Sequence, residues 1–129
     1  MIDHFGYVMV YVEDPVAVAN FFVEQLNFKQ VSSEQNANGV FSVQVAPREG
    51  SDAHLNFFSK PLARQISPDL NLAMPSLCFG SYDVVKLHDD LAAKGVAVGD
   101  VINLNGMKAV NFADNEGNSY AVRQIEREN

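Results

Sequence analysis

Residues 5–28 read FGYVMVYVEDPVAVANFFVEQLNF, and this stretch determines how the first half of the chain folds. Its opening run, Phe5–Val12, is almost entirely apolar and rich in valine and tyrosine, which predicts a strand buried on both faces. Asp14-Pro15 then supplies a helix N-cap and a suitable first helical residue. Apolar side chains recur at helical spacing over 15–26, and Asn27 tolerates the left-handed conformation of a C-cap. We therefore expect a strand followed directly by an amphipathic helix.

Three further strands are expected after this helix, each separated from the next by a turn signal. The turn signals are Asn38-Gly39 and Glu49-Gly50, which are typical of hairpins. The predicted strands are 28–31, 40–46 and 54–58. The first half of the chain is thus predicted to be a βαβββ unit.

The second half of the chain repeats this order. We expect a strand at 77–79, a helix at 83–94, and strands at 96–104, 107–113 and 119–125. Helix caps and turn glycines of the two halves match at nearly constant spacing. The pairs Asp14/Asp83, Asn27/Gly95, Gly39/Gly106 and Gly50/Gly117 are separated by 69, 68, 67 and 67 residues.

Four matched signals that drift by only two residues indicate a tandem βαβββ repeat. The fold class is therefore α+β, with mixed sheets. We expect one domain over 1–129 made of two modules, about 1–59 and 75–129, with a connector at 60–74 that packs on the surface.

Composition excludes several classes of protein. The chain has 129 residues, of which 47% are hydrophobic and 19% charged, so a disordered chain is excluded. Nine basic against sixteen acidic residues give a net charge of −7, which argues against nucleic-acid or anionic-membrane partners. The single cysteine, Cys78, excludes an internal disulfide and a cysteine-based zinc site. No apolar run approaches the ~20 residues that span a bilayer and no leader is visible, so a cytoplasmic protein is expected.

Short motifs around these landmarks resemble those of the vicinal oxygen chelate superfamily, which includes glyoxalases, bleomycin-resistance proteins and extradiol dioxygenases. The resemblance covers nearly the whole chain and has two departures, Asn115 where proline is usual and Asn27 where glycine is usual. Both departures keep the turn chemistry. The motifs are Val12-Glu13-Asp14-Pro15, Phe21-Phe22, Leu26-Asn27-Phe28, Asp83–Gly95 and Phe112-Ala113-Asp114-Asn115-Glu116-Gly117-Asn118.

The resemblance implies that each module curls its sheet into a half-barrel and that the two sheets enclose a cleft. Metal-binding members take oxygen and imidazole ligands from the first and last strands of the modules. Those positions correspond by spacing to Tyr7, Asn56, Leu77 and Ala121 in this chain. Leu77 and Ala121 have no donor atom, and a register slip of two residues adds only His54 as a good ligand. We therefore expect neither a metal nor another cofactor.

Three other residues could carry chemistry. His54 is either a strand histidine hydrogen-bonded to a neighbour or a cleft-facing group that orients a ligand or moves a proton. Arg123 either pairs with Glu126 or Glu128 or anchors an anionic group. Cys78 has the opposite parity to its strand neighbours, so we expect it to point towards the helix as a small buried hydrophobe.

Side chains of one parity are expected to line a single small-molecule pocket, although the same residues also describe an ordinary core. No catalytic residue is assigned. The expected ligand-binding residues are Tyr7, Met9, Tyr11, His54, Asn56, Phe58, Leu77, Phe79 and Arg123.

Three functions are compatible with these features. The first is a metal-free small-molecule binding protein of the bleomycin-resistance type that forms a homodimer, and the missing metal ligands favour it. The second is an enzyme of the glyoxalase or dioxygenase type (a lyase, isomerase or oxygenase), with displaced metal ligands or with acid–base chemistry through His54, Tyr7 or Tyr11. The third is a domain that serves only for interaction.

Overall fold

The computed structural model describes residues 1–127, and the elements occur in the predicted order, strand–helix–three strands, in each half of the chain. Glu128, one of the acids considered as a partner of Arg123, lies outside the described residues. The elements are β1 (Val8–Val12), α1 (Pro15–Leu26), β2 (Lys29–Asn36), β3 (Gly39–Ala46), β4 (Leu55–Ser59), α2 (Lys60–Ile66), β5 (Cys78–Ser81), α3 (Val84–Ala93), β6 (Ile102–Leu104), β7 (Met107–Ala113) and β8 (Ser119–Gln124).

The chain is α+β and divides into two units, residues 1–74 and the part from Pro75 onward. Each unit contains one four-stranded mixed sheet, with strand order β1-β4-β3-β2 in the first and β5-β8-β7-β6 in the second. In each sheet the first two strands of this order run parallel and the others antiparallel.

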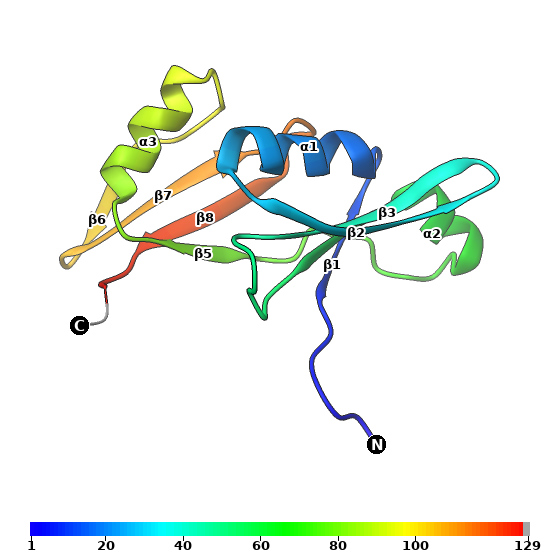
Figure 1. Cartoon of the computed structure of the whole chain (residues 1–129). Helices are drawn as coiled ribbons and strands as arrows, with labels where there is room; N and C mark the ends of the chain where they lie inside the picture. Colours follow the sequence, from blue (N-terminus) through cyan, green and yellow to red (C-terminus); the bar gives the residue numbers. More distant parts are fainter. Residues whose placement is uncertain (128–129) are drawn as a thin grey trace. The chain divides into compact units, whose positions relative to one another are not determined.

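In the first unit, α1 covers one face of the sheet (Figure 1). Phe22 of this helix is fully buried, and its ring centroid lies 5.1 Å from Phe57 of β4 and 5.0 Å from Phe28. The core between helix and sheet thus contains edge-packed aromatic rings surrounded by β-branched side chains. The other buried residues on this side are Val10, Val12, Val18, Ala19, Val43, Val45 and Leu55.

The ends of α1 are fixed by the residues predicted to cap it. The Oδ1 atom of Asp14 accepts a hydrogen bond from the backbone N–H of Ala17 at 3.1 Å, and Pro15 is the first helical residue. Asn27 ends the helix with φ 59°, the left-handed conformation expected of a C-cap. The predicted helix 15–26 is confirmed.

In the second unit, α3 packs on β7 and β8 (Figure 1). Asp83 caps this helix in the same way as Asp14 caps α1, since its Oδ1 accepts from the N–H of Lys86 at 3.0 Å. The rings of Phe79, Phe112 and Tyr120 stack on one another with centroids 5.2–6.4 Å apart. These rings, with Val84, Leu91, Val110 and Val122, form the buried side of the second sheet.

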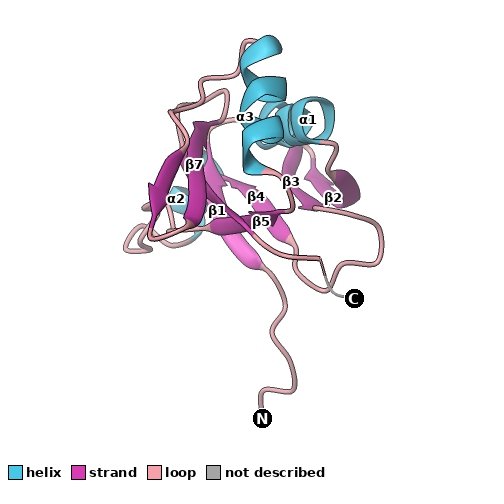
Figure 2. Cartoon of the chain, turned by 90° about the vertical axis from the view of Figure 1, so that its left-hand side faces the viewer, coloured by secondary structure: helices cyan, strands magenta, loops and turns pink. Residues whose placement is uncertain are grey.

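Two strands are shorter than the sequence predicted. β1 begins at Val8, and the residues before it run as a loop away from the sheet, with Phe5 82% exposed (Figure 2). Of the predicted strand 96–104, only β6 pairs continuously, while Val98 makes an isolated bridge to Phe112. Residues 97–99 lie beside β7 but make only this bridge and two backbone hydrogen bonds to it, so alternation alone did not make the segment a continuous strand.

The connector contains a helix, α2, that the sequence analysis did not predict. Ser59 caps it by accepting a hydrogen bond from the N–H of Leu62 at 3.2 Å. Ala63 is buried, and α2 contacts β1 and β4, so this part of the connector packs against the first sheet. Two apolar side chains of the connector, Ile66 and Leu70, are exposed, so not all of this segment packs against the sheet as expected.

Candidate functional site

The first sheet has one face against α1 and a second face that carries several of the predicted site residues. Strand register places Met9 beside Asn56 and Tyr11 beside Phe58, while Phe57 points to the helix. The side-chain parity predicted for β1 and β4 is therefore confirmed. We call the second face the open face and define it by Met9, Tyr11, Gln44, Asn56 and Phe58.

Asn56 occupies the centre of the open face, between Met9 of β1 and Gln44 of β3. Its side chain is 3% exposed, and its amide N–H donates to the sulfur of Met9 at 3.5 Å. Within the described residues, its Oδ1 atom has no hydrogen-bond partner. A buried acceptor without a donor costs about 1–3 kcal/mol of stability. Asparagine is also a poor strand former, so both strand formation and burial disfavour this residue here.

Aromatic rings lie next to Asn56 on β1 and β4. Tyr11 and Phe58 meet edge to face with centroids 6.0 Å apart, and Phe58 also meets Phe41 of β3 at 5.6 Å. Both Tyr11 and Phe58 are half-buried. This part of the sheet offers ring edges and faces together with one polar acceptor, a combination typical of small-molecule sites.

His54 precedes β4 and is held on both sides of its ring. Its Nε2 atom lies 2.8 Å from the carbonyl oxygen of Ser51, so Nε2–H is the donor there. Its Nδ1 atom lies 3.1 Å from the side-chain oxygen Oε1 of Gln44. Because both nitrogens are engaged, His54 matches the structural interpretation, a strand histidine hydrogen-bonded to its neighbours. Its role in ligand binding stays a prediction.

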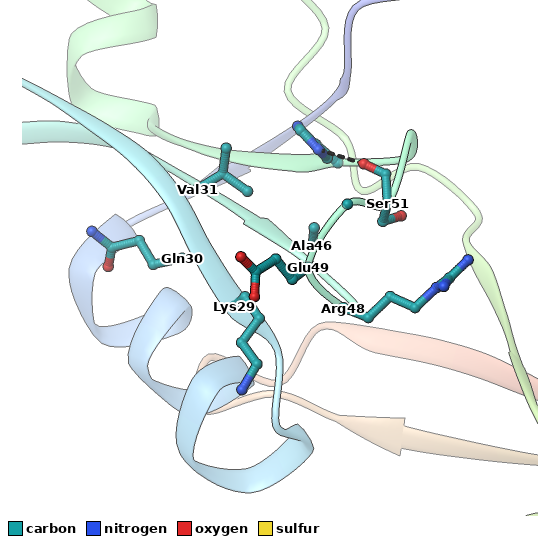
Figure 3. A pocket seen from close by; sticks show the side chains of 9 residues that line it. Lys29, Gln30, Val31, Ala46, Arg48, Glu49 and Ser51 are labelled. Carbon is teal, nitrogen blue, oxygen red and sulfur yellow. Dashed lines mark hydrogen bonds between the residues drawn. The ribbon is translucent and has the colours of Figure 1, made fainter.

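A cavity of about 590 Å³ opens beside His54, between the start of β2 and the loop from β3 to β4. Among the predicted site residues only His54 lines it, and Lys29 and Arg48 add cationic groups that the sequence analysis did not single out. Arg48 extends away from the other labelled side chains (Figure 3), so the two cations do not converge on one point. The lining residues are Lys29, Gln30, Val31, Ala46, Arg48, Glu49, Gly50, Ser51 and His54.

A second cavity, of about 270 Å³, is also lined by His54 and brings this residue together with Tyr7. Tyr7 stands just before β1 and is 41% exposed. Phe5 and Asp52 also line this cavity. The predicted set in the first unit is thus distributed over the open face and the two cavities at its His54 end.

In the second unit, the predicted orientation of β5 is wrong. Phe79 pairs with Val122 and stacks on Phe112, so it belongs to the buried side with the core. Leu77 precedes Phe79 by two residues and therefore has the same side-chain parity. Cys78, expected to face the helix, is exposed and pairs with Ala121. The reason is that Phe79 completes a stack of three rings, which removes more apolar surface from water than Cys78 could.

Arg123 lies on the opposite side of this sheet from Phe79. It is exposed and its register partners are Gly80 of β5 and Ala109 of β7. This orientation, shared with Ala121, is the predicted one. Phe79 and Arg123 therefore do not line the same surface of the second sheet.

Residues with hydrogen-bonding side chains on β3 were missed by the sequence analysis. Gln44 stands beside Asn56 and contacts His54, and Ser42 stands beside Phe58. The alternation of Ser42 and Gln44 with the buried Val43 and Val45 could have identified them, because side chains two apart face the same way.

The donor atoms present do not fit the metal that the family resemblance implies. Across residues 1–127, no group of three or more histidine, cysteine, aspartate or glutamate side chains could hold an ion. Of the four corresponding positions, Leu77 and Ala121 bear hydrocarbon, Tyr7 is a poor ligand, and Asn56 directs its N–H to a sulfur.

A buried aspartate organises the turn between β7 and β8. Asp114 accepts hydrogen bonds from the backbone N–H groups of Glu116 and Asn118 and from the hydroxyl of Tyr120 at 2.7 Å. Burial, and then the neighbouring carboxylate, raises the pKa of the Tyr120 hydroxyl well above its ordinary value of 10.0. This cluster is structural, because all its members hold the turn together.

Comparison with known proteins gives similar structures over nearly the full chain. One is TnmS3, an antibiotic binding protein from Streptomyces sp. CB03234, with 25% identity, TM-score 0.75, and coverage of 97% of this chain and 98% of that chain. Another is a member of the glyoxalase/bleomycin resistance protein/dioxygenase superfamily from Sphaerobacter thermophilus DSM 20745, with 21% identity, TM-score 0.76, and coverage of 96% and 98%. TioX from Micromonospora sp. ML1 has 12% identity, TM-score 0.76, and coverage of 95% and 98%.

A search of curated protein sequences finds no match. No helix among the described residues has the length and apolar character needed to cross a membrane. The model of the Glyoxalase/Bleomycin resistance protein/Dioxygenase superfamily matches residues 2–122, almost the entire sequence. The chain belongs to the Glyoxalase/Bleomycin resistance protein/Dioxygenase superfamily.

Proposed function

We propose that this protein binds a small organic molecule without a metal ion, and that the open face of the first sheet contacts the ligand. The observation that carries the proposal is the buried acceptor of Asn56 among half-buried rings and methionine. A surface of this kind can hold an apolar ligand and fix its orientation through one polar contact. TnmS3, whose structure resembles this chain at 25% identity, is described as an antibiotic binding protein, which supports the same class of function.

The proposed ligand-contacting residues are the predicted ones that occupy the open face or its His54 end. Tyr7 and His54 stand at the cavity end. Arg123 lies on the second sheet, so its predicted role as an anchor for an anionic group is a separate prediction and not part of this site. Phe79 is not included, because it stacks on Phe112 and Tyr120 of the core, and Leu77 is left out because it has the same parity. The remaining contacts are Met9, Tyr11, Asn56 and Phe58.

The enzyme alternative has less support. Acid–base chemistry through His54 would need a free ring nitrogen, and both nitrogens are hydrogen-bonded to Ser51 and Gln44. Metal-assisted chemistry would need donors that Leu77 and Ala121 do not supply.

Thermal unfolding of EDTA-treated protein with a panel of 2-naphthol, an anthracycline and bleomycin tests the proposal. We expect at least one compound to raise Tm by a few degrees, because a ligand that binds only the folded chain stabilises it. Zinc, nickel, manganese or iron added at micromolar concentration should leave this shift unchanged. Stabilisation that requires one of these ions, or about one such ion per purified chain by elemental analysis, would contradict metal-free binding.

We also propose that the protein is a cytoplasmic homodimer. β2 is an edge strand whose eight residues are all exposed, and it leaves one edge of the first sheet available for pairing. The free cysteine, Cys78, suits a reducing compartment. Light scattering on the purified chain should give twice the chain mass, whereas the mass of one chain would contradict the dimer.

A further inference from the structure

We propose that the ligand is an uncharged aromatic molecule that donates a hydroxyl or N–H hydrogen bond to Oδ1 of Asn56. This inference rests on the proposed function and specifies the chemical class of the ligand. It starts from the one polar side-chain atom that the described residues leave buried and unpaired.

The polarity of the contact follows from the orientation of the Asn56 amide. Its N–H group points to the Met9 sulfur at 3.5 Å, a contact that an acceptor oxygen in the same place would not favour. The Oδ1 atom is thus the free group, and a carbonyl oxygen can only accept. A ligand that satisfies it must bring a donor.

The neutrality of the ligand follows from the residues around Asn56. Met9, Tyr11, Gln44 and Phe58, the other members of the open face, carry no carboxylate, ammonium or guanidinium group. A charged ligand group brought against them would lose its hydration without gaining a partner. A neutral hydroxyl or N–H has no such cost.

The aromatic character follows from the neighbouring rings. Tyr11 and Phe58 meet edge to face at 77°, an arrangement that can accept another ring at an edge or face. Methionine sulfur also makes favourable contacts with aromatic rings.

Access to Asn56 is controlled by Met9. This side chain is half-buried, unbranched, and holds the amide only through an N–H···S contact, which is a weak hydrogen bond. Because Met9 is flexible and held there by one weak contact, it can shift to admit a ligand to the Asn56 amide.

The matched probes 2-naphthol and 2-methoxynaphthalene test this inference, since they share both rings and an oxygen but only the first can donate. Dissociation constants come from ¹H–¹⁵N NMR titrations of the full chain, with shifts of β1 and β4 amides locating the probe. We expect wild type to bind 2-naphthol at least about tenfold more tightly than the ether, because the ether leaves the buried oxygen unpaired.

In Asn56→Leu, the dissociation constants of the two probes should differ by no more than about twofold. If the leucine variant does not fold, Asn56→Ala provides the same test, because the smaller side chain fits without displacing its neighbours. The control Asn20→Leu, at an exposed position of α1, should keep the wild-type ratio. In the absence of probe, Asn56→Leu should also raise Tm by roughly 2–5 °C, because it removes an unpaired buried acceptor.

Equal binding of the two probes to wild type at the open face overturns the inference and leaves the proposed function standing. A ratio that persists in Asn56→Leu and Asn56→Ala also overturns it. If neither the probes nor any compound of the antibiotic panel shifts the amides of β1 and β4, the proposed function itself fails, and this inference fails with it.

Discussion

At the residue scale, two buried polar side chains, Asp114 and Asn56, differ in whether their polar atoms are hydrogen-bonded. Asp114 is buried with three backbone and side-chain donors around it and a tyrosine hydroxyl at 2.7 Å. Asn56 is equally buried but has one polar atom unpaired. A satisfied buried group stabilises the fold, whereas an unsatisfied one costs stability and points to a role in binding.

Removing the hydroxyl that contacts Asp114 should destabilise the protein. Tyr120→Phe should cost about 1–3 kcal/mol in urea unfolding, because a buried carboxylate oxygen loses the shorter of its two hydrogen bonds. Tyr82→Phe is the matched control: Tyr82 is exposed, and its ring, which stacks with Arg127 at 4.1 Å, is retained. Equal effects of the two substitutions would contradict the role given to the Asp114 contact.

The same hydroxyl predicts a loss of stability at alkaline pH. The pKa of Tyr120 is raised in the folded state, so the stability from its neutral form is complete below its unfolded value near 10 and is lost as pH rises above that value. Unfolding free energies between pH 8 and 11 should therefore fall more steeply for wild type than for Tyr120→Phe. Parallel pH profiles would show that the hydroxyl titrates as freely in the folded chain as in the unfolded one.

At the element scale, α1 and α3 begin in the same way, and β5 shows where parity arguments fail. Asp14 and Asp83 each accept a hydrogen bond from the N–H three residues on, at 3.1 and 3.0 Å. β5 has only four residues, and no alternation in Cys78–Ser81 indicates which side is buried. Its orientation is decided by contacts of Phe79 with residues far along the chain.

The two helix caps should contribute equally. Asp14→Ala and Asp83→Ala should each cost about 0.5–2 kcal/mol of unfolding free energy, since each leaves a helix N–H unpaired. Asp52→Ala, in the exposed loop before β4, is the control and should change stability by less than about 0.5 kcal/mol. If one cap matters and the other does not, the two helices are not equivalent elements of a repeat.

The corrected orientation of β5 predicts that Cys78 reacts in the folded protein. Because its side chain is exposed, a thiol reagent should label about one cysteine per chain under native conditions, at a rate close to that in urea. A cysteine that is labelled only after unfolding would restore the original orientation, with Cys78 against the helix.

At the scale of the whole molecule, the element order and most boundaries could be predicted, because caps and turn glycines are local signals. Gly39, Gly50, Gly106 and Gly117 all have positive φ, as hairpin turns require. The connector helix α2 was missed because its stability comes from packing of Ala63 against the first sheet, which no local pattern indicates.

The candidate site could be predicted only in part. Alternation gave the correct side for Met9, Tyr11, Asn56 and Phe58, because β1 and β4 are long enough to alternate. The hydrogen bonds of His54 and the unpaired oxygen of Asn56 depend on neighbours in other strands, so they became visible only in three dimensions.

The central claim, metal-free binding of a small molecule at the open face, is tested most directly by mapping a bound compound on EDTA-treated, ¹⁵N-labelled protein. With 2-naphthol or a panel compound that raises Tm, we predict saturable amide shifts in β1 and β4 around Tyr11, Asn56 and Phe58. These shifts should be identical after a divalent ion is added. Saturable shifts confined to other strands, or shifts that appear only when the ion is present, would contradict the claim.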